Sequence, residues 1–593
     1  MISENASEEW RRAASALAPV TQSTGQPGEY DLYPSFSLGA GKIKSGYPAL
    51  ARWVSFHRHI RLDGYIGVFW EQVRNELGSE LEKLGLSVAW YNVSSAMLPE
   101  KIIDKLVHYF MKGDDPLFGT KCSLKLWYFF NSKLLGKIDY NDTYDISIAY
   151  GCGASLVDWV GPVAYIDLPK NELQFRSRAG SVSNLGKSAS NDPKEMYRRF
   201  YFVDWPVLNR HKKDILPNIE LIVDGQRPET PVVMSGYEFR EGLRSISVGV
   251  FRVRPWFEPG PWGGTWLKKH IRKLNQDAQN YAWSFELIVP ENGLFFESDN
   301  LLLEFSFDFL IFQEQNNILG KAAERFGDEF PIRFDFLDTF EGGNLSVQVH
   351  PTEKYIKKEF GESFTQDESY YIIDAGENAT VNLGFVENIK PGKFRNELEN
   401  SYKHNRPVEI NRFVQSHPSC KHDLFLIPNQ TIHGSGKDNL VLEISSTPYI
   451  FTFKMYDWLR PDLDGNPRSL NIERAFNNLD FSRKGKWVTE NLIARPKIID
   501  KGKDWQLVHL PTHPNHFYDV FRYEFDTILD VETENRCHVM MLVEGSSILV
   551  GTLGGKKYRY NYAETFIIPA ACGSYHIINE GNERAMVVRA FVK

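Results

Sequence analysis

From residue 246 onward the sequence consists of short runs in which apolar and polar residues alternate, with Gly, Pro or Asn between one run and the next. Alternation with a period of two is typical of β-strands that bury one face. Many short strands of this kind predict a β-sandwich or a barrel. We expect strands at 247–254, 345–350, 369–373, 380–385, 423–427, 439–445 and 449–453, with helical insertions near 316–326 and 393–404.

The first 245 residues have a different pattern, in which helical segments alternate with short strand-like runs. Val73, Leu77 and Leu81 recur at a four-residue spacing, which predicts an amphipathic helix that ends near Gly85. A strand, a helix and a strand in this order predict a βαβ unit and a parallel sheet. The expected strands lie at 59–68 and 87–93 around the helix, and at 144–150 and 160–168 further along.

The change in pattern predicts the domain organisation. We expect an α/β domain over residues 1–245, a mostly-β domain with a helical insertion over 246–500, and a second small β-barrel over 501–593. A chain of 593 residues is long enough for such a division, because a domain usually takes roughly 150 residues.

Composition excludes several classes of protein. The net charge of −8 disfavours a dedicated nucleic-acid binder. The five cysteines lie far apart without a C-x-x-C pair, which argues against a disulfide framework and a thiolate zinc site. No run approaches the ~18 apolar residues of a membrane span, and the N-terminus carries acids where a signal peptide has a basic region. We therefore expect a cytoplasmic protein without nucleic-acid or membrane partners.

The segment 344–351, Asn-Leu-Ser-Val-Gln-Val-His-Pro, carries the pattern with the clearest chemistry. As a strand it places Gln348 and His350 on one face, two residues apart. Glu368 opens a later strand-like run, and His433 lies in a turn before another. Imidazole, carboxylate and amide oxygen together suit a divalent ion such as zinc. The alternative is that these are ordinary polar side chains on a half-exposed strand.

Several short motifs follow one another in a recognisable order. Residues 330–338 read Phe-Pro-Ile-Arg-Phe-Asp-Phe-Leu-Asp and 345–351 read Leu-Ser-Val-Gln-Val-His-Pro. Together they resemble the signature of type I phosphomannose isomerases (mannose-6-phosphate isomerases) of the cupin superfamily. The resemblance extends over roughly residues 250–593, through similar motifs at 262–267, 284–287, 368–374, 427–434, 442–444, 452–458 and 464–470.

This resemblance implies a cupin fold (a double-stranded β-helix), one zinc ion and an aldose–ketose isomerisation such as mannose 6-phosphate to fructose 6-phosphate. The family's metal ligands fall on Gln348, His350, Glu368 and His433. The implied partner is a small-molecule sugar or sugar phosphate. Our candidate catalytic residues are Arg468 and Lys454, at positions that the family motifs match, and Glu443, which shares one face of its strand with Val441 and Ser445. For Glu443 a structural carboxylate is the alternative.

The chain also departs from the family's pattern at positively charged positions. Asp335 and Gln366 stand where the family usually has Lys, Lys454 stands in place of Arg, and Asn471 in place of His. A phosphate needs Arg or Lys donors. Three readings stay open: other groups hold the phosphate, the sugar is different or unphosphorylated, or catalysis is lost. The last leaves a non-catalytic, metal-containing sugar-binding or regulatory protein as the alternative.

A weaker motif lies in the N-terminal domain. Asp63-Gly-Tyr-Ile-Gly-Val-Phe-Trp follows a predicted strand and precedes the predicted helix, where a phosphate-binding loop would lie. It is slightly similar to a degenerate P-loop of nucleoside or sugar kinases, but it lacks the lysine and the glycine spacing of that motif. A tight structural turn is the alternative.

Overall fold

The computed structural model describes residues 9–22, 25–112 and 117–593. The chain forms two compact units that are interleaved in sequence. Unit 1 takes the described residues of Met1–Thr24 together with Tyr33–Ser247 and Pro290–Gln315, and unit 2 takes Gly25–Leu32, Val248–Val289 and Asn316–Lys593. The segment Pro290–Gln315 joins unit 1 because its strand β11 (Gly293–Ser298) pairs in parallel with β1 (Ser35–Ser37) and antiparallel with β12 (Leu301–Ser306).

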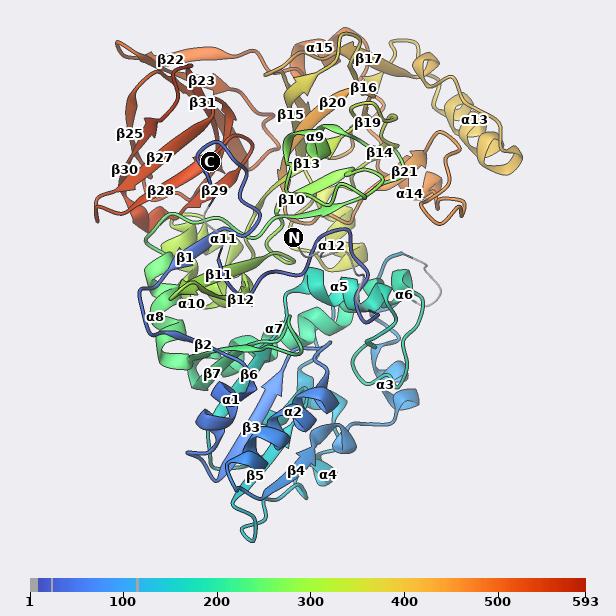
Figure 1. The fold of residues 1–593 in the computed structure, drawn as a ribbon. Coiled ribbons are helices and arrows are strands. Elements are labelled where there is room, and N and C mark those ends of the chain that lie inside the picture. Colours follow the sequence, from blue (N-terminus) through green and yellow to red (C-terminus); the bar gives the residue numbers. More distant parts are fainter. Residues whose placement is uncertain (1–8, 23–24, 113–116) are drawn as a thin grey trace. The chain divides into compact units, whose positions relative to one another are not determined.

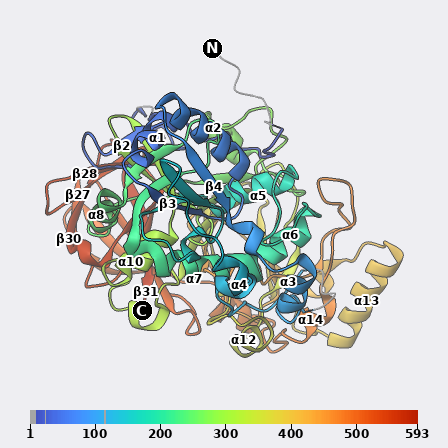
Figure 2. The same cartoon turned by 90° about the horizontal axis from the view of Figure 1, so that it is seen from below.

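Unit 1 is built on a seven-stranded sheet with the order β2-β8-β7-β6-β3-β5-β4. The five strands from β7 to β4 are parallel, and β8 and β2 add antiparallel edges. Helices α1 and α2 lie on one face of this sheet, and α7 and α8 on the other (Figures 1 and 2). The strands are β2 (Ile43–Ser45), β3 (His59–Gly64), β4 (Val88–Asn92), β5 (Ile146–Tyr150), β6 (Val163–Asp167), β7 (Ile219–Asp224) and β8 (Val232–Ser235), and the helices are α1 (Tyr47–Val54), α2 (Trp70–Lys83), α3 (Glu100–Val107), α4 (Ser132–Leu135), α5 (Lys170–Arg178), α6 (Pro193–Arg199), α7 (Trp205–Ile215) and α8 (Gly236–Ile246).

Helix α2 follows the apolar spacing of the sequence. Val73, Leu77 and Leu81 are buried in a core cluster with residues of α1 and of the sheet. The helix ends at Lys83, and Gly85 takes a φ of +77° while its N–H donates to Glu82 O at 2.8 Å. Glycine suits this left-handed position at a helix C-terminus because it has no Cβ. Strands β3 and β4 flank α2 in sequence, but β5 lies between them in the sheet.

The first part of unit 2 consists of two antiparallel sheets, which confirms that this part of the chain is mostly β. Their orders are β18-β15-β20-β13-β10-β9 and β17-β16-β19-β14-β21. The first holds β9 (Trp256–Glu258), β10 (Trp283–Leu287), β13 (Ile332–Asp338), β15 (Glu368–Ala375), β18 (Leu424–Ile427) and β20 (Asn439–Ser446), and the second β14 (Val347–Val349), β16 (Thr380–Phe385), β17 (Val414–Pro418), β19 (His433–Ser435) and β21 (Phe453–Tyr456).

Helices interrupt these sheets near the places that the sequence predicted. The C-terminal part of α10 (Asp308–Leu319) and α11 (Ala323–Phe326) cover one expected insertion, and α13 (Pro391–His404) the other. Further helices are α9 (Trp266–His270), α12 (Glu353–Phe360), α14 (Ile472–Phe476) and α15 (Lys486–Asn491).

The last part of unit 2 has two sheets of its own, in the orders β22-β23-β24-β31-β26-β29 and β25-β30-β27-β28. Their inner faces form one apolar core that includes Phe525, Met540, Ile548 and Val587. The strands are β22 (Lys497–Lys501), β23 (Trp505–Leu510), β24 (Tyr518–Phe525), β25 (Ile528–Glu532), β26 (His538–Glu544), β27 (Ser547–Thr552), β28 (Lys557–Asn561), β29 (Thr565–Ile568), β30 (Ser574–Asn579) and β31 (Ala585–Val592).

Two strand predictions are wrong. Of the residues expected at 449–453, only Phe453 lies in a strand, β21 (Phe453–Tyr456). Residues 247–254 form no strand, and Phe251 makes only an isolated bridge to Ile567. The segment is held by charge rather than by a ladder, because the buried Arg252 lies 3.3 Å from Glu286 and 3.1 Å from Glu564. Among the described parts of the chain, no helix is long and apolar enough to cross a membrane.

Candidate metal centre

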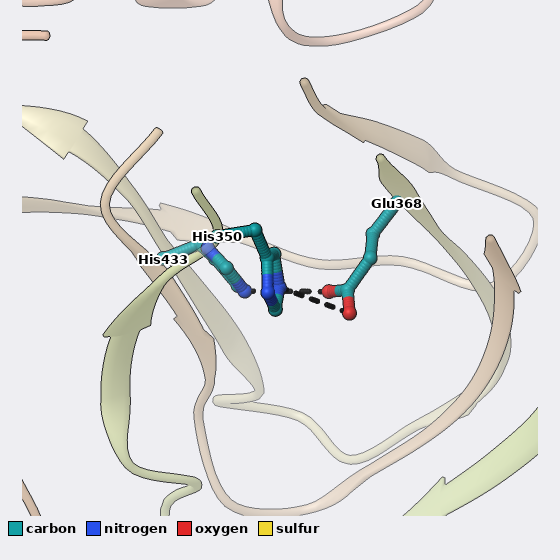
Figure 3. A group of neighbouring side chains, drawn as sticks. All are labelled: His350, Glu368 and His433. Atoms are coloured by element: carbon teal, nitrogen blue, oxygen red, sulfur yellow. Dashed lines mark ion pairs between the residues drawn. The ribbon is translucent and has the colours of Figure 1, made fainter. Parts of the chain in front are cut away.

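Three of the four predicted ligands converge inside the first pair of sheets of unit 2. His350 directly follows β14, Glu368 is the first residue of β15, and His433 is the first residue of β19. One ligand atom from each lies within 4.8 Å of the other two, and all three side chains are buried. The carboxylate of Glu368 faces both rings, with its oxygens 3.0 Å from His350 Nε2 and 3.3 Å from His433 Nε2 (Figure 3).

Hydrogen bonds fix the two imidazole rings so that each Nε2 faces the cluster. His350 Nδ1 donates to Phe451 O at 3.1 Å, and His433 Nδ1 donates to Thr431 O at 2.9 Å. A ring that donates through Nδ1 keeps a lone pair on Nε2, which is the form that binds metals. His350 Nε2 and Glu368 Oε2 are buried without a hydrogen-bond partner among the described residues. This donor set therefore fits a divalent cation such as zinc.

The cluster also controls the charge of its carboxylate. Burial alone would raise the pKa of Glu368, but the neighbouring His350 and His433 hold it well below its usual range. Burial lowers the pKa of His433. Gln366 donates to Glu368 Oε1 at 2.5 Å and so orients this carboxylate. Glu368 is therefore held as a carboxylate, the charge state that metal ligation requires of it.

Gln348 lies beside this cluster on β14, where it pairs across the sheet with His433. Its Oε1 accepts from Ser346 Oγ at 2.8 Å, and its Nε2 lies 3.3 Å from His433 Nε2. Gln348 offers its oxygen to an ion only after the amide turns by about 180°, which exchanges two atoms of nearly equal size. The structure thus brings the fourth predicted ligand to the site, with the amide nitrogen turned toward it.

A buried arginine that the sequence analysis did not single out neutralises the next group of carboxylates. Arg333 on β13 lies 3.1 Å from Asp335 and 3.7 Å from Glu368, and it forms an ion pair with Glu443. Asp335 and Glu443 are paired across β13 and β20. Burial raises the pKa of Asp335 to about 6 in spite of Arg333. Asp335 therefore belongs to a buried ion cluster, and Glu443 is held by Arg333 and by Ser445 Oγ at 2.9 Å.

The predicted residues Lys454 and Arg468 lie near another carboxylate. Lys454 is partly buried on β21 and pairs across the sheet with Gln348. Burial and the neighbouring Arg468 and Arg460 lower the pKa of Lys454 to about 8. Arg468 and Arg460 form ion pairs with Asp457, at 2.5 and 2.6 Å. Asp457 thus pairs with two arginines, and Asp462 also acts electrostatically on Arg468.

The sequence contained a signal for Arg333. It stands two residues before Asp335 in an alternating run, and such residues share one face of a strand. Its partner Glu443 is 110 residues further along the chain, so no local spacing points to the ion pair. The ion pair between Arg333 and Glu443 therefore became visible only through the register of β13 with β20.

Comparison with known proteins gives two separate results. A family model described as "Domain of unknown function (DUF8485)" matches residues 46–248. That match assigns no chemistry to the loop after Asp63, so its kinase-like similarity stays a prediction.

The other result concerns about half of the chain. Mannose-6-phosphate isomerase ManA of Bacillus subtilis (strain 168) is 26% identical over 324 residues, covering 55% of this chain and 94% of that protein. Mannose-6-phosphate isomerase of Streptococcus mutans is 26% identical over 223 residues, covering 37% of this chain and 65% of that protein. The crystal structure of the Bacillus subtilis mannose 6-phosphate isomerase aligns with a TM-score of 0.46 and 20% identity, covering 57% of this chain and 98% of that one. The chain is thus similar over about half its length to proteins named mannose-6-phosphate isomerase.

Proposed function

We propose that the chain is a metal-dependent aldose–ketose isomerase that acts on a sugar phosphate, with mannose 6-phosphate and fructose 6-phosphate as the first substrate pair to test. The observation that carries this proposal is the buried group of His350, Glu368 and His433, whose ligand atoms lie within 4.8 Å of one another. The sequence similarity to ManA supports the reaction class. We assign the two facing sheets to a cupin-type barrel and the ion to zinc.

In this proposal each residue of the site has its own role in the isomerisation. When bound, the ion supplies a Lewis acid that polarises a carbonyl oxygen of the sugar. His350, His433 and Glu368 hold the ion, and Gln348 contributes its amide oxygen after rotation. Lys454 is the donor that we assign to the sugar oxygen on which negative charge develops, because no described residue forms a hydrogen bond or ion pair with its ammonium group.

The phosphate needs a separate group of cations, and Arg468 and Arg460 supply it in this proposal. Both contact the carboxylate of Asp457, and both lie close enough to Lys454 to lower its pKa. Arginine forks suit phosphate oxygens. Glu443 and Asp335 are already paired with Arg333, so we assign them to charge balance rather than to proton transfer.

Isomerase activity is the direct test of this function. Protein loaded with zinc and mixed with mannose 6-phosphate should form fructose 6-phosphate, followed by NMR of the sugar carbons. Chelation should abolish the reaction, and added zinc should restore it. Fully metal-loaded protein without turnover would remove the proposal and favour the sugar-binding alternative.

Lys454 gives a second prediction. Replacing Lys454 by Met should lower kcat about 10²- to 10³-fold, the range found when one donor to a developing charge is removed. Lys454→Arg should retain most of the activity because the positive charge stays. Metal content measured by elemental analysis should be unchanged in both variants. A loss of zinc in Lys454→Met would show instead that this lysine supports the metal site.

A further inference from the structure

Unit 1 contains an open cavity where its central parallel strands end. Strands β5 and β4 lie on one side of β3, and β6 and β7 lie on the other. Open α/β sheets bind ligands at the carboxyl ends of strands where the strand order reverses in this way. The cavity has a volume of about 800 Å³, which is within the range of small-molecule sites. Its lining comes from the segments that follow β3, β4, β5 and α5, including 66–70, Asn92, Ser94, Cys152 and 180–190.

The loop between β3 and α2 supplies unused hydrogen-bond donors to this lining. Tyr65 N–H donates to Ile166 O at 2.9 Å, and Trp70 N–H donates to Val68 O at 3.0 Å. The N–H groups of 66–69, which lie between them, find no acceptor in the described chain. The hydroxyl of the exposed Ser94 is likewise without a partner among those residues. Such donors favour a ligand that carries hydroxyl or carbonyl oxygens.

The charges on the lining disfavour an anion. Among the described residues that line the cavity, Lys187 is the only basic one, and its Nζ lies 3.1 Å from Glu100 and 2.7 Å from Asp104. Arg199 also lies 3.7 Å from Asp104, so the charges at this edge balance and Lys187 is already paired. The first turn of α2 begins with Trp70 and Glu71, where a phosphate-binding loop has Lys and Ser or Thr. A phosphate group would therefore find no unpaired cation among the described residues of the lining.

Aromatic surface completes the site. Phe69 and Trp70 are partly exposed and line the cavity next to the free N–H groups. Aromatic rings bury the flat apolar face of a ring compound while neighbouring polar groups bind its edge. We propose that this cavity binds an uncharged ring compound rich in hydroxyl groups, the chemistry shared by free sugars and nucleosides. All the described residues that line the site belong to unit 1.

Calorimetry on the full chain tests this site, with adenosine, D-mannose and Mg–ATP as probes. Adenosine or D-mannose should bind with a Kd below about 1 mM, and Mg–ATP should bind at least tenfold more weakly. The two neutral probes separate a nucleoside site from a sugar site. All titrations are repeated on His350→Ala, so that binding at the metal centre is recognised by its loss.

A matched pair of variants locates the binding. Ser94→Trp fills the cavity from an exposed position and should weaken binding at least tenfold. Ser95→Trp changes the neighbouring exposed residue, which is not part of the lining, and should leave binding unchanged. The proposal is overturned if neither neutral probe binds, if Mg–ATP binds more tightly, or if Ser94→Trp has no effect. Each of these outcomes leaves the isomerase proposal untouched.

Discussion

His350→Ala is expected to abolish both zinc binding and isomerase activity. The substitution removes one of the three groups whose ligand atoms lie within 4.8 Å of one another. Loss of one imidazole leaves Glu368 and His433 to hold the ion, and an incomplete donor set does not keep a divalent cation in place. We expect less than about 0.1 zinc per chain by elemental analysis, and a fall in kcat/KM of about 10³-fold or more.

His404→Ala is the matched control for this prediction. His404 is exposed at the end of α13, in the same unit but outside the cluster. This variant should retain both its zinc and its activity. If His350→Ala keeps a full equivalent of zinc while His404→Ala loses it, the ion binds elsewhere and the assignment of the site is wrong.

Arg333→Leu is expected to destabilise the first pair of sheets of unit 2 by about 3–5 kcal/mol. Arg333 is the buried cation between Asp335, Glu443 and Glu368. Its removal leaves these carboxylates in the interior without a counter-charge, and an unpaired buried charge costs far more than a lost surface ion pair. The free energy of unfolding is measured by urea titration of metal-free protein, so that zinc does not contribute.

Two further variants show whether charge is the cause. Arg395→Leu removes an exposed ion pair with Glu399 and should cost less than about 1 kcal/mol. The double variant Arg333→Leu/Asp335→Leu should be more stable than Arg333→Leu, because it also removes one of the unpaired carboxylates. Equal stability of Arg333→Leu and Arg395→Leu would mean that the buried cluster does not need its cation.

The alternation of residues in the sequence predicted part of the candidate site. Gln348 and His350 were expected on one face of a strand, and the structure places both at the site, although β14 is only the three-residue strand Val347–Val349. Glu368 and His433 lie 18 and 83 residues beyond His350, spacings that carry no local metal motif. Their place in the site was predicted from the family resemblance and not from hydrophobic periodicity or strand propensity. Ligands on different sheets come together only through the pairing of strands that are far apart in the sequence.

The interleaving of the two units in the sequence could not be predicted from local patterns either, because it also depends on long-range strand pairing. The expected division placed 290–315 in the mostly-β domain because it set a single boundary near residue 246. In the structure β11 pairs with β1, more than 250 residues away in the chain. Local patterns specify that a segment is a strand, but its partners depend on side-chain packing across distant elements.

Anomalous X-ray scattering at the zinc absorption edge, on crystals of the zinc-loaded protein, tests the central claim most directly. The account predicts one peak inside unit 2, with His350 Nε2, His433 Nε2 and a carboxylate oxygen of Glu368 at about 2.0–2.2 Å. The Gln348 amide oxygen should be turned toward the same peak. A zinc peak at any other group of residues, or none at this one in zinc-loaded crystals, would contradict the account.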